Sequence, residues 1–150
     1  MRSVVQRVRS ARVTVDGEEV GRIGPGMLVL LAAAPADGKE QVRWMAEKLC
    51  GLRIFSDEAG KMNVSLADVK GAMLVVSQFT LYGDCKKGKR PSYSGAARPE
   101  HAERVYEEFI DEIRSKGIPV QHGVFGAMMI VELENDGPVT LIVDSPEGVF

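Results

Sequence analysis

The stretch Ala72-Met73-Leu74-Val75-Val76-Ser77-Gln78-Phe79-Thr80-Leu81 passes directly from a continuous apolar run into a polar cluster. An unbroken apolar run of this length is typical of a strand that is covered on both faces. Such a strand delivers Ser77 and its neighbours at its end, where a rigid frame can display chemistry. Residues 27–31 (MLVLL) form a second run of the same kind. The sequence therefore predicts two buried strands, one of which leads into a candidate site.

Two amphipathic helices are predicted outside these runs. Asp37 is the predicted N-terminal cap of the first helix, and the second begins at Pro99 and ends at Gly117. Their apolar residues recur at helical spacing: Val42, Met45, Ala46 and Leu49 in the first, and Ala102, Val105, Tyr106, Phe109 and Ile113 in the second.

Shorter segments predict the remaining strands, at residues 4–8, 13–15, 20–23, 52–55, 128–133 and 139–143. Asp16-Gly17 predicts a hairpin turn, and Asn135-Asp136-Gly137-Pro138 predicts a turn that joins the last two strands. The order of strands, helix, strands, helix, strands predicts one mixed α/β domain over residues 1–150.

Size and composition exclude several classes of protein. With 150 residues, 45% of them hydrophobic, the chain is ordinary for one globular domain. Its longest apolar run, residues 27–35, is too short to cross a bilayer, and no signal-peptide pattern precedes the first strand. Cys50 and Cys85 make neither a disulfide framework nor a zinc site. We expect a soluble, cytoplasmic protein without membrane contact.

The charge distribution is more informative than the net charge of −2, which argues against a general nucleic-acid coat. A dense basic group (Lys86, Lys87, Lys89 and Arg90) lies in a long predicted surface loop, residues 82–97. This group suits a local phosphate contact better than a long RNA footprint. The alternative is a solvated loop that keeps the protein soluble.

Common catalytic chemistries fit the residues poorly. A serine hydrolase would need a histidine beside Ser77, and only His101 and His122 are available, without a Gly-x-Ser-x-Gly motif. The two histidines lack metal-ligand spacing, and no glycine-rich phosphate cradle follows a strand. We expect no metal and no cofactor.

Gly137-Pro138 is less usual, because proline removes a hydrogen-bond donor from a strand pair. An X-Pro bond adopts the cis form at a cost of about 0.5–1 kcal/mol. A cis Gly-Pro would present a rigid pair of backbone acceptors to a substrate amine. On the dipeptide alone, an ordinary trans turn is the favoured interpretation.

Motifs along essentially the whole chain resemble the D-aminoacyl-tRNA deacylases in order and spacing. They are MRSVVQRV (1–8), VTVDG (13–17), IGPG (23–26), LRIF (52–55), GKMN (60–63), SQFTLYGD (77–84), RPS (90–92), FGAMM (125–129) and NDGPVT (135–140). The resemblance implies a three-layer α/β/β fold, mostly strands with two main helices. It also implies a homodimer, with active sites at the subunit interface, that hydrolyses the ester between a D-amino acid and tRNA.

The resemblance also assigns roles to residues. Ser77, Gln78, Phe79 and Thr80 match the pocket floor, and Gly137-Pro138 matches a cis dipeptide that reaches in from the partner subunit to hold the substrate's α-amino group. Arg7 matches a residue that fixes that dipeptide. Phe125 and Met129 match positions near the substrate and the terminal adenosine. Lys86, Lys87, Lys89 and Arg90 are the expected tRNA contacts.

The chemistry of ester hydrolysis is consistent with these roles. Backbone N–H groups around Gln78 and Phe79 can stabilise the developing oxyanion. A rigid grip on the amine would turn a D side chain toward solvent and an L side chain into the wall, so glycyl-tRNA would be poorly excluded. The nucleophile is either Thr80 or an activated water, which we favour. Two alternatives remain: a non-catalytic RNA-end binding module, and a small-ester or amide hydrolase using Ser77 with His122 or His101.

Overall fold

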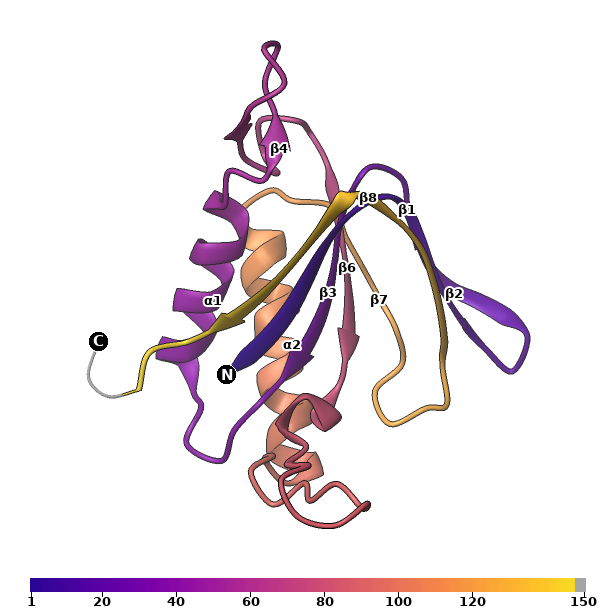
Figure 1. Ribbon diagram of the computed structural model, residues 1–150, viewed down its shortest axis with the longest axis vertical. Coiled ribbons are helices and arrows are strands. Elements are labelled where there is room, and N and C mark those ends of the chain that lie inside the picture. Colours follow the sequence, from indigo (N-terminus) through magenta and orange to yellow (C-terminus); the bar gives the residue numbers. More distant parts are fainter. Residues whose placement is uncertain (148–150) are drawn as a thin grey trace.

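Strands dominate the computed structural model, which describes residues 1–147 (Figure 1). The strands are β1 (Arg2–Val15), β2 (Glu18–Ile23), β3 (Gly26–Ala32), β4 (Phe55–Ser56), β5 (Met62–Val64), β6 (Ala72–Ser77), β7 (Val120–His122) and β8 (Ile130–Asp144). The helices are α1 (Lys39–Gly51), the 3-10 turn η1 (Phe79–Tyr82) and α2 (Pro99–Ser115). The predicted mixed α/β class with two main helices is confirmed.

One sheet organises the molecule, in the order β2-β1-β3-β6-β7, with β8 paired to the other edge of β1. The long strand β1 is antiparallel to β2, β3 and β8. By contrast, β3, β6 and β7 run parallel to one another. The carboxyl ends of β3 and β6 therefore lie next to each other. Loops at the carboxyl ends of parallel strands commonly form binding crevices.

The sheet has a separate apolar core on each face, which explains the unbroken apolarity of β3 and β6. Met27, Val29 and Leu31 of β3 point into the larger core beneath α1 and α2. The alternate residue Leu28 points into a second core with Leu74 of β6. Because side chains alternate across a strand, burial of both faces requires apolar residues at every position. The helices therefore form one layer, and the curled sheet forms the other two.

The N-terminal and C-terminal strands are longer than the sequence predicted. Two strands were expected in the first fifteen residues, but β1 is continuous. The predicted hairpin at residues 128–143 is also wrong, because β8 is one strand that pairs with β1 along its length. The Asn135–Pro138 segment is not a hairpin turn. It is part of an irregularity in β8: Gln6 pairs with Thr140 and Val8 with Asn135, so that residues 136–139 lie opposite Arg7 alone.

Two local predictions also need correction. Gly38, not Asp37, is the N-cap of α1. Asp37 instead forms a buried ion pair with the amino group of Met1, at 2.7 Å, and accepts a hydrogen bond from the Ala34 N–H. The strand predicted at residues 52–55 is reduced to Phe55 and Ser56, which pair with β5 in a small separate sheet.

Neither α1 nor α2 is long and apolar enough to cross a membrane, and no other helix among residues 1–147 is.

Candidate active site

The polar cluster Ser77-Gln78-Phe79-Thr80 lies where β6 ends, beside the end of β3. Ser77 is the last residue of β6 and pairs with Leu31 of β3. The Gln78 N–H donates to the Leu31 carbonyl at 2.8 Å, which fixes the backbone as it leaves the sheet. The chain then turns through η1, where the Gln78 side chain donates to the Thr80 hydroxyl. The rigid end of the sheet thus presents this turn at the surface.

A pocket of about 610 Å³ opens beside this turn, which is within the usual size range for small-molecule sites. Five of the predicted site residues line it: Ser77, Gln78, Phe79, Phe125 and Met129. The loop between β7 and β8 also lines the pocket and includes Met128, which is 90% exposed. Phe79 is also in the lining and is 52% exposed. The pocket is therefore apolar, with polar groups supplied by the end of β6.

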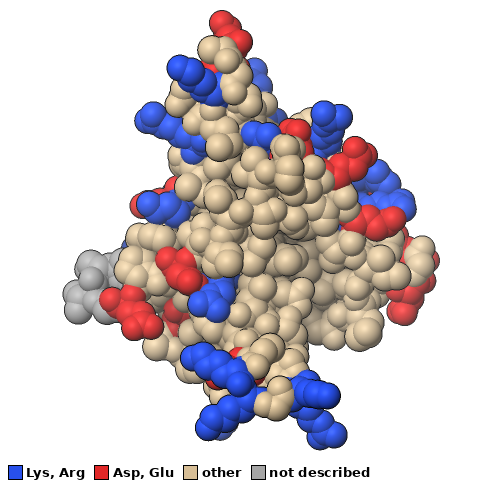
Figure 2. Space-filling model, in the orientation of Figure 1, with Lys and Arg blue, Asp and Glu red and all other residues tan. Residues whose placement is uncertain are grey.

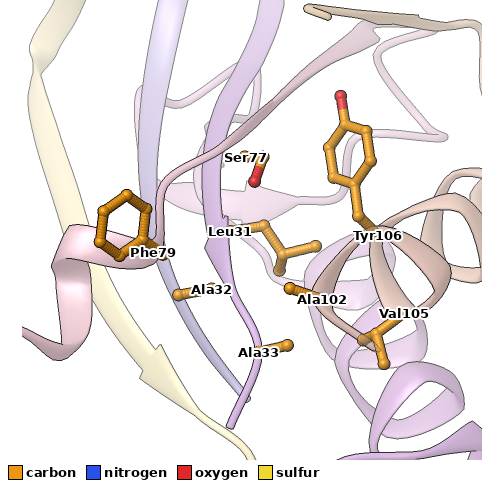
Figure 3. A pocket seen from close by; sticks show the side chains of 8 residues that line it. All are labelled: Leu31, Ala32, Ala33, Ser77, Phe79, Ala102, Val105 and Tyr106. Carbon is orange, nitrogen blue, oxygen red and sulfur yellow. The ribbon is translucent and has the colours of Figure 1, made fainter. Parts of the chain in front are cut away.

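A smaller cavity of about 10 Å³ is lined in part by Ser77 and Phe79 (Figure 3). The end of β3 forms one side of it, and Ala102, Val105 and Tyr106 of α2 form the other. The Tyr106 hydroxyl donates to the Val75 carbonyl at 3.1 Å, and burial raises the pKa of this phenol. Tyr106 is thus uncharged, and its hydrogen bond links α2 to the strand that carries Ser77.

Both histidines form hydrogen bonds with groups other than Ser77. His101 Nε2 hydrogen bonds with the Asp37 carbonyl at 2.7 Å, and His122 Nδ1 with the Gly123 carbonyl at 2.6 Å. Neither forms a hydrogen bond with Ser77. A nucleophilic serine needs its base within hydrogen-bond reach, so the geometry does not favour a serine hydrolase. Among residues 1–147, no cluster of His, Cys, Asp or Glu side chains has the grouping to hold a metal ion.

Gly137-Pro138 lies in the β8 irregularity, and its peptide bond is cis. The trans turn favoured on the dipeptide alone is therefore wrong. The Asn135 side-chain amide bridges the base of this segment by donating to the carbonyls of Arg7 and Val139, both at 3.0 Å. This role of Asn135 was not predicted from the sequence. Its place as the first residue of the NDGPVT motif was the signal that could have pointed to it.

Arg7 holds the dipeptide from the other side. Its Nε donates to the Asp136 carbonyl at 3.1 Å, and its Nη1 donates to the Ile54 carbonyl at 2.7 Å. An ion pair at 3.4 Å links the guanidinium to the Asp136 carboxylate. The Arg7 side chain is 12% exposed, so these bonds are shielded from water. Arg7 therefore ties Gly137-Pro138 to the segment that leads into β4.

Within one chain, Gly137-Pro138 does not line the pocket. Ser77 is level with Leu31 of β3, Ser3 of β1 and Val143 of β8, whereas the dipeptide lies opposite Arg7. Four residues along β1 and three strand-to-strand steps correspond to about 13 Å and about 14 Å respectively. The two predicted halves of the site are therefore far apart in the monomer.

The predicted tRNA contacts lie together in the loop that leaves η1. Lys86, Lys87, Lys89 and Arg90 are all exposed. A bridge between Asp84 and Ser92 closes the base of this loop. Figure 2 shows basic side chains gathered at the lower end of the molecule, where Figure 1 places the segment between η1 and α2. Tyr93 of the same loop lines the pocket and packs edge-on against Phe79, at 5.2 Å between ring centroids. No pattern in the sequence singled out Tyr93.

Comparison with known proteins identifies the family. The model of the D-Tyr-tRNA(Tyr) deacylase family matches residues 4–144. The chain belongs to this family. Its reaction is therefore hydrolysis of the ester bond of a D-aminoacyl-tRNA, a step of proofreading in translation.

Individual relatives agree with this assignment over nearly the full length. The D-aminoacyl-tRNA deacylase of Desulfatibacillum aliphaticivorans is 61% identical, covering 97% of this chain and 99% of the relative. That of Thermus aquaticus is 56% identical, covering 98% and 97%.

Solved structures share the fold. A protein described as "c-Myc DNA Unwinding Element Binding Protein" is 42% identical, with a TM-score of 0.92 over 97% of this chain and 99% of that one. A probable eukaryotic D-amino acid tRNA deacylase, 20% identical, superposes with a TM-score of 0.84 over 96% of this chain and 98% of that one.

Proposed function

We propose that the pocket beside η1 binds the aminoacyl end of the tRNA and that the turn itself supplies the oxyanion site. The observation that carries this proposal is the placement of Ser77, Gln78 and Phe79 at the end of a buried strand, facing a pocket of about 610 Å³. The Gln78 N–H is occupied by the Leu31 carbonyl, so the donor we assign to the oxyanion is the Phe79 N–H. A donor held in place by the fold needs no reorganisation as charge develops on the ester oxygen. Phe125 and Met129 also line the pocket, and they would provide apolar contact for the terminal adenosine.

A second copy of the chain completes the site. Gly137-Pro138 is too far from the pocket of its own chain to reach a substrate there, so we assign it to the pocket of the partner subunit in a homodimer. Ile142, on the same strand, is 72% exposed, and Met128 at the pocket rim is 90% exposed. Apolar side chains that are this exposed to solvent favour a contact with another protein chain. They support an interface beside the pocket.

This arrangement would select D-amino acids by exclusion. The two backbone acceptors of Gly137-Pro138 would hold the substrate's α-amino group, which leaves each enantiomer's side chain one direction. An L side chain would meet the wall and a D side chain would not. Glycine has no side chain to exclude, so glycyl-tRNA is a further proposed substrate. Because its substrate is aminoacyl-tRNA, we propose that the enzyme acts in the cytoplasm.

Activated water is the proposed nucleophile, and Thr80 is a positioning residue. The Thr80 hydroxyl accepts a hydrogen bond from Gln78, and no histidine or carboxylate among residues 1–147 hydrogen bonds to it. A hydroxyl nucleophile needs a base at that distance. The substrate's own ribose 2′-hydroxyl can assist the water. If Thr80→Ala abolished single-turnover hydrolysis while tRNA binding survived, the direct nucleophile would be the better model.

The basic loop is proposed to contact the phosphates of the acceptor end. Lys86, Lys87, Lys89 and Arg90 follow η1 directly and extend into solvent, so a tRNA end in the pocket would pass beside them. Each phosphate contact releases counterions, which makes binding weaken as salt rises. Replacing two of these lysines with alanine should therefore flatten the salt dependence of KM and leave kcat unchanged.

The decisive experiment compares hydrolysis of D-tyrosyl-tRNA and L-tyrosyl-tRNA by the purified protein. The proposal predicts rapid loss of the D-ester and a stable L-ester. Equal cleavage of both would indicate a non-stereospecific hydrolase. Inertness toward both, with tRNA still bound, would instead indicate an RNA-end binding module.

A further inference from the structure

Arg2, the first residue of β1, connects three parts of the structure with one side chain. Its Nε and Nη2 donate to the two carboxylate oxygens of Asp144 in β8, at 2.7 and 3.3 Å. Its Nη1 donates to the Leu81 carbonyl of η1 at 3.2 Å. The guanidinium carbon also lies 5.3 Å from the centre of the Tyr82 ring. Arg2 therefore joins the adjacent ends of β1 and β8 to the turn.

The η1 turn has few other anchors. No residue of the turn is buried. Its internal hydrogen bonds, from Leu81 N to Gln78 O and from Gly83 N to Thr80 O, close the turn without attaching it to the sheet. The Gln78 N–H holds the start of the turn to β3. Among residues 1–147, Arg2 makes the only side-chain hydrogen bond that reaches the turn from another element.

We propose that Arg2 is a positioning residue for ester hydrolysis, clamping η1 so that the backbone N–H group of Phe79 keeps its aim at the reacting ester. This inference rests on the proposed function of the turn. The planar fork of arginine fits the task, because one face can lie on an aromatic ring while separate N–H groups bind a carboxylate and a carbonyl. Lysine carries the same charge but cannot make these contacts together.

The clamp acts on the chemical step rather than on tRNA binding. Donors aimed at a developing oxyanion contribute mainly in the transition state, so their misplacement lowers kcat. Arg2 does not line the pocket and lies outside the basic loop. Its loss should leave the contacts that bind the tRNA unchanged, and KM with them.

Arg12 offers a matched control on the same two strands. It pairs with Glu132 of β8 much as Arg2 pairs with Asp144, and the two arginines are similarly exposed, at 42% and 37%. Arg12 makes no hydrogen bond to η1. Arg12→Ala therefore removes a comparable ion pair between β1 and β8 and leaves the turn untouched.

The test is steady-state hydrolysis of D-tyrosyl-tRNA by wild type, Arg2→Ala, Arg2→Lys and Arg12→Ala. We expect kcat to fall about ten-fold in both Arg2 variants, with KM changed by less than about two-fold, because small misplacements of catalytic groups carry large rate penalties. Arg12→Ala should match wild type. Unfolding midpoints and assembly state are measured for each variant, and Arg2→Lys carries the test if Arg2→Ala does not fold.

Hydrogen–deuterium exchange of the peptide spanning residues 78–83 provides a readout that does not depend on activity. Exchange should be faster in both Arg2 variants than in wild type and Arg12→Ala. A change in KM at constant kcat, or exchange equal to that of Arg12→Ala, would overturn the clamp. If wild type were inert toward the D-ester, the proposed function would fail, and the exchange data alone would support or overturn the contact of Arg2 with the turn.

Discussion

Replacement of Gly137 by alanine tests the proposed grip on the substrate amine most directly. A Cβ atom at this position would lie 2.9 Å from Arg7 Nη2, 3.0 Å from Val139 Cγ2 and 3.1 Å from Val139 N. The residue also has φ of +124°, a backbone conformation that residues other than glycine rarely adopt. The alanine variant therefore meets both a steric and a backbone penalty.

The size of the effect follows from that penalty. A residue forced into such a backbone conformation costs about 1–3 kcal/mol. Each 1.4 kcal/mol corresponds to about a factor of ten. If the dipeptide moves to relieve the penalty, its acceptors lose their aim at the amine, and kcat/KM for D-tyrosyl-tRNA should fall by about 5-fold to 150-fold.

Single-turnover hydrolysis of matched D- and L-tyrosyl-tRNA is the appropriate assay. Gly117→Ala is the control, because Gly117 also has positive φ, +80°, but within residues 1–147 no atom beyond its immediate chain neighbours lies within 4 Å of the added methyl group. The control should lose stability without losing chiral preference. Wild-type rates in Gly137→Ala, with an unchanged ratio of D to L cleavage, would refute the role assigned to the dipeptide.

Three further predictions concern stability and the histidines. Asp37→Asn should lower the free energy of unfolding by about 3 kcal/mol in urea titrations, because the buried Met1 amino group loses its charged partner. Burial raises the pKa of Tyr82 to about 12 in the folded protein. The unfolded chain therefore loses this proton first, and stability should fall as pH rises from about 10 to about 12. Tyr82→Phe should show a smaller fall in the same titration. His101→Ala and His122→Ala should keep kcat within about two-fold of wild type. A large loss of kcat would instead support the alternative of a serine hydrolase.

Local pattern was sufficient where neighbouring residues determine the structure. The helix stripe ending at Leu49 and the second helix starting at Pro99 were correctly placed, because helical spacing and a terminal proline act within a few residues. The apolar runs of β3 and β6 correctly indicated burial on both faces. Family motifs pointed to the pocket residues Ser77, Phe79 and Phe125.

Local sequence pattern gave wrong predictions where residues remote in sequence determine the structure. Asp37 has the residue type of a helix cap, but the Met1 amino group, far away in sequence, competes for its carboxylate. Asn135-Asp136-Gly137-Pro138 has the composition of a hairpin turn. Yet the long strand β1 pairs with the residues on both sides of it, and β8 passes through as one strand.

By itself, the sequence determined the secondary structure of the buried elements, the existence of a polar cluster after β6 and the family to which the motifs belong. Only the tertiary structure decided that Ser77 and Gly137-Pro138 lie far apart in one chain, that Arg7 reaches both Ile54 and Asp136, and that Arg2 reaches η1. The physical reason is that hydrophobic periodicity records only which face of an element is buried. Strand register and the reach of long side chains depend on partners that are remote in sequence, and these partners set the geometry of the site.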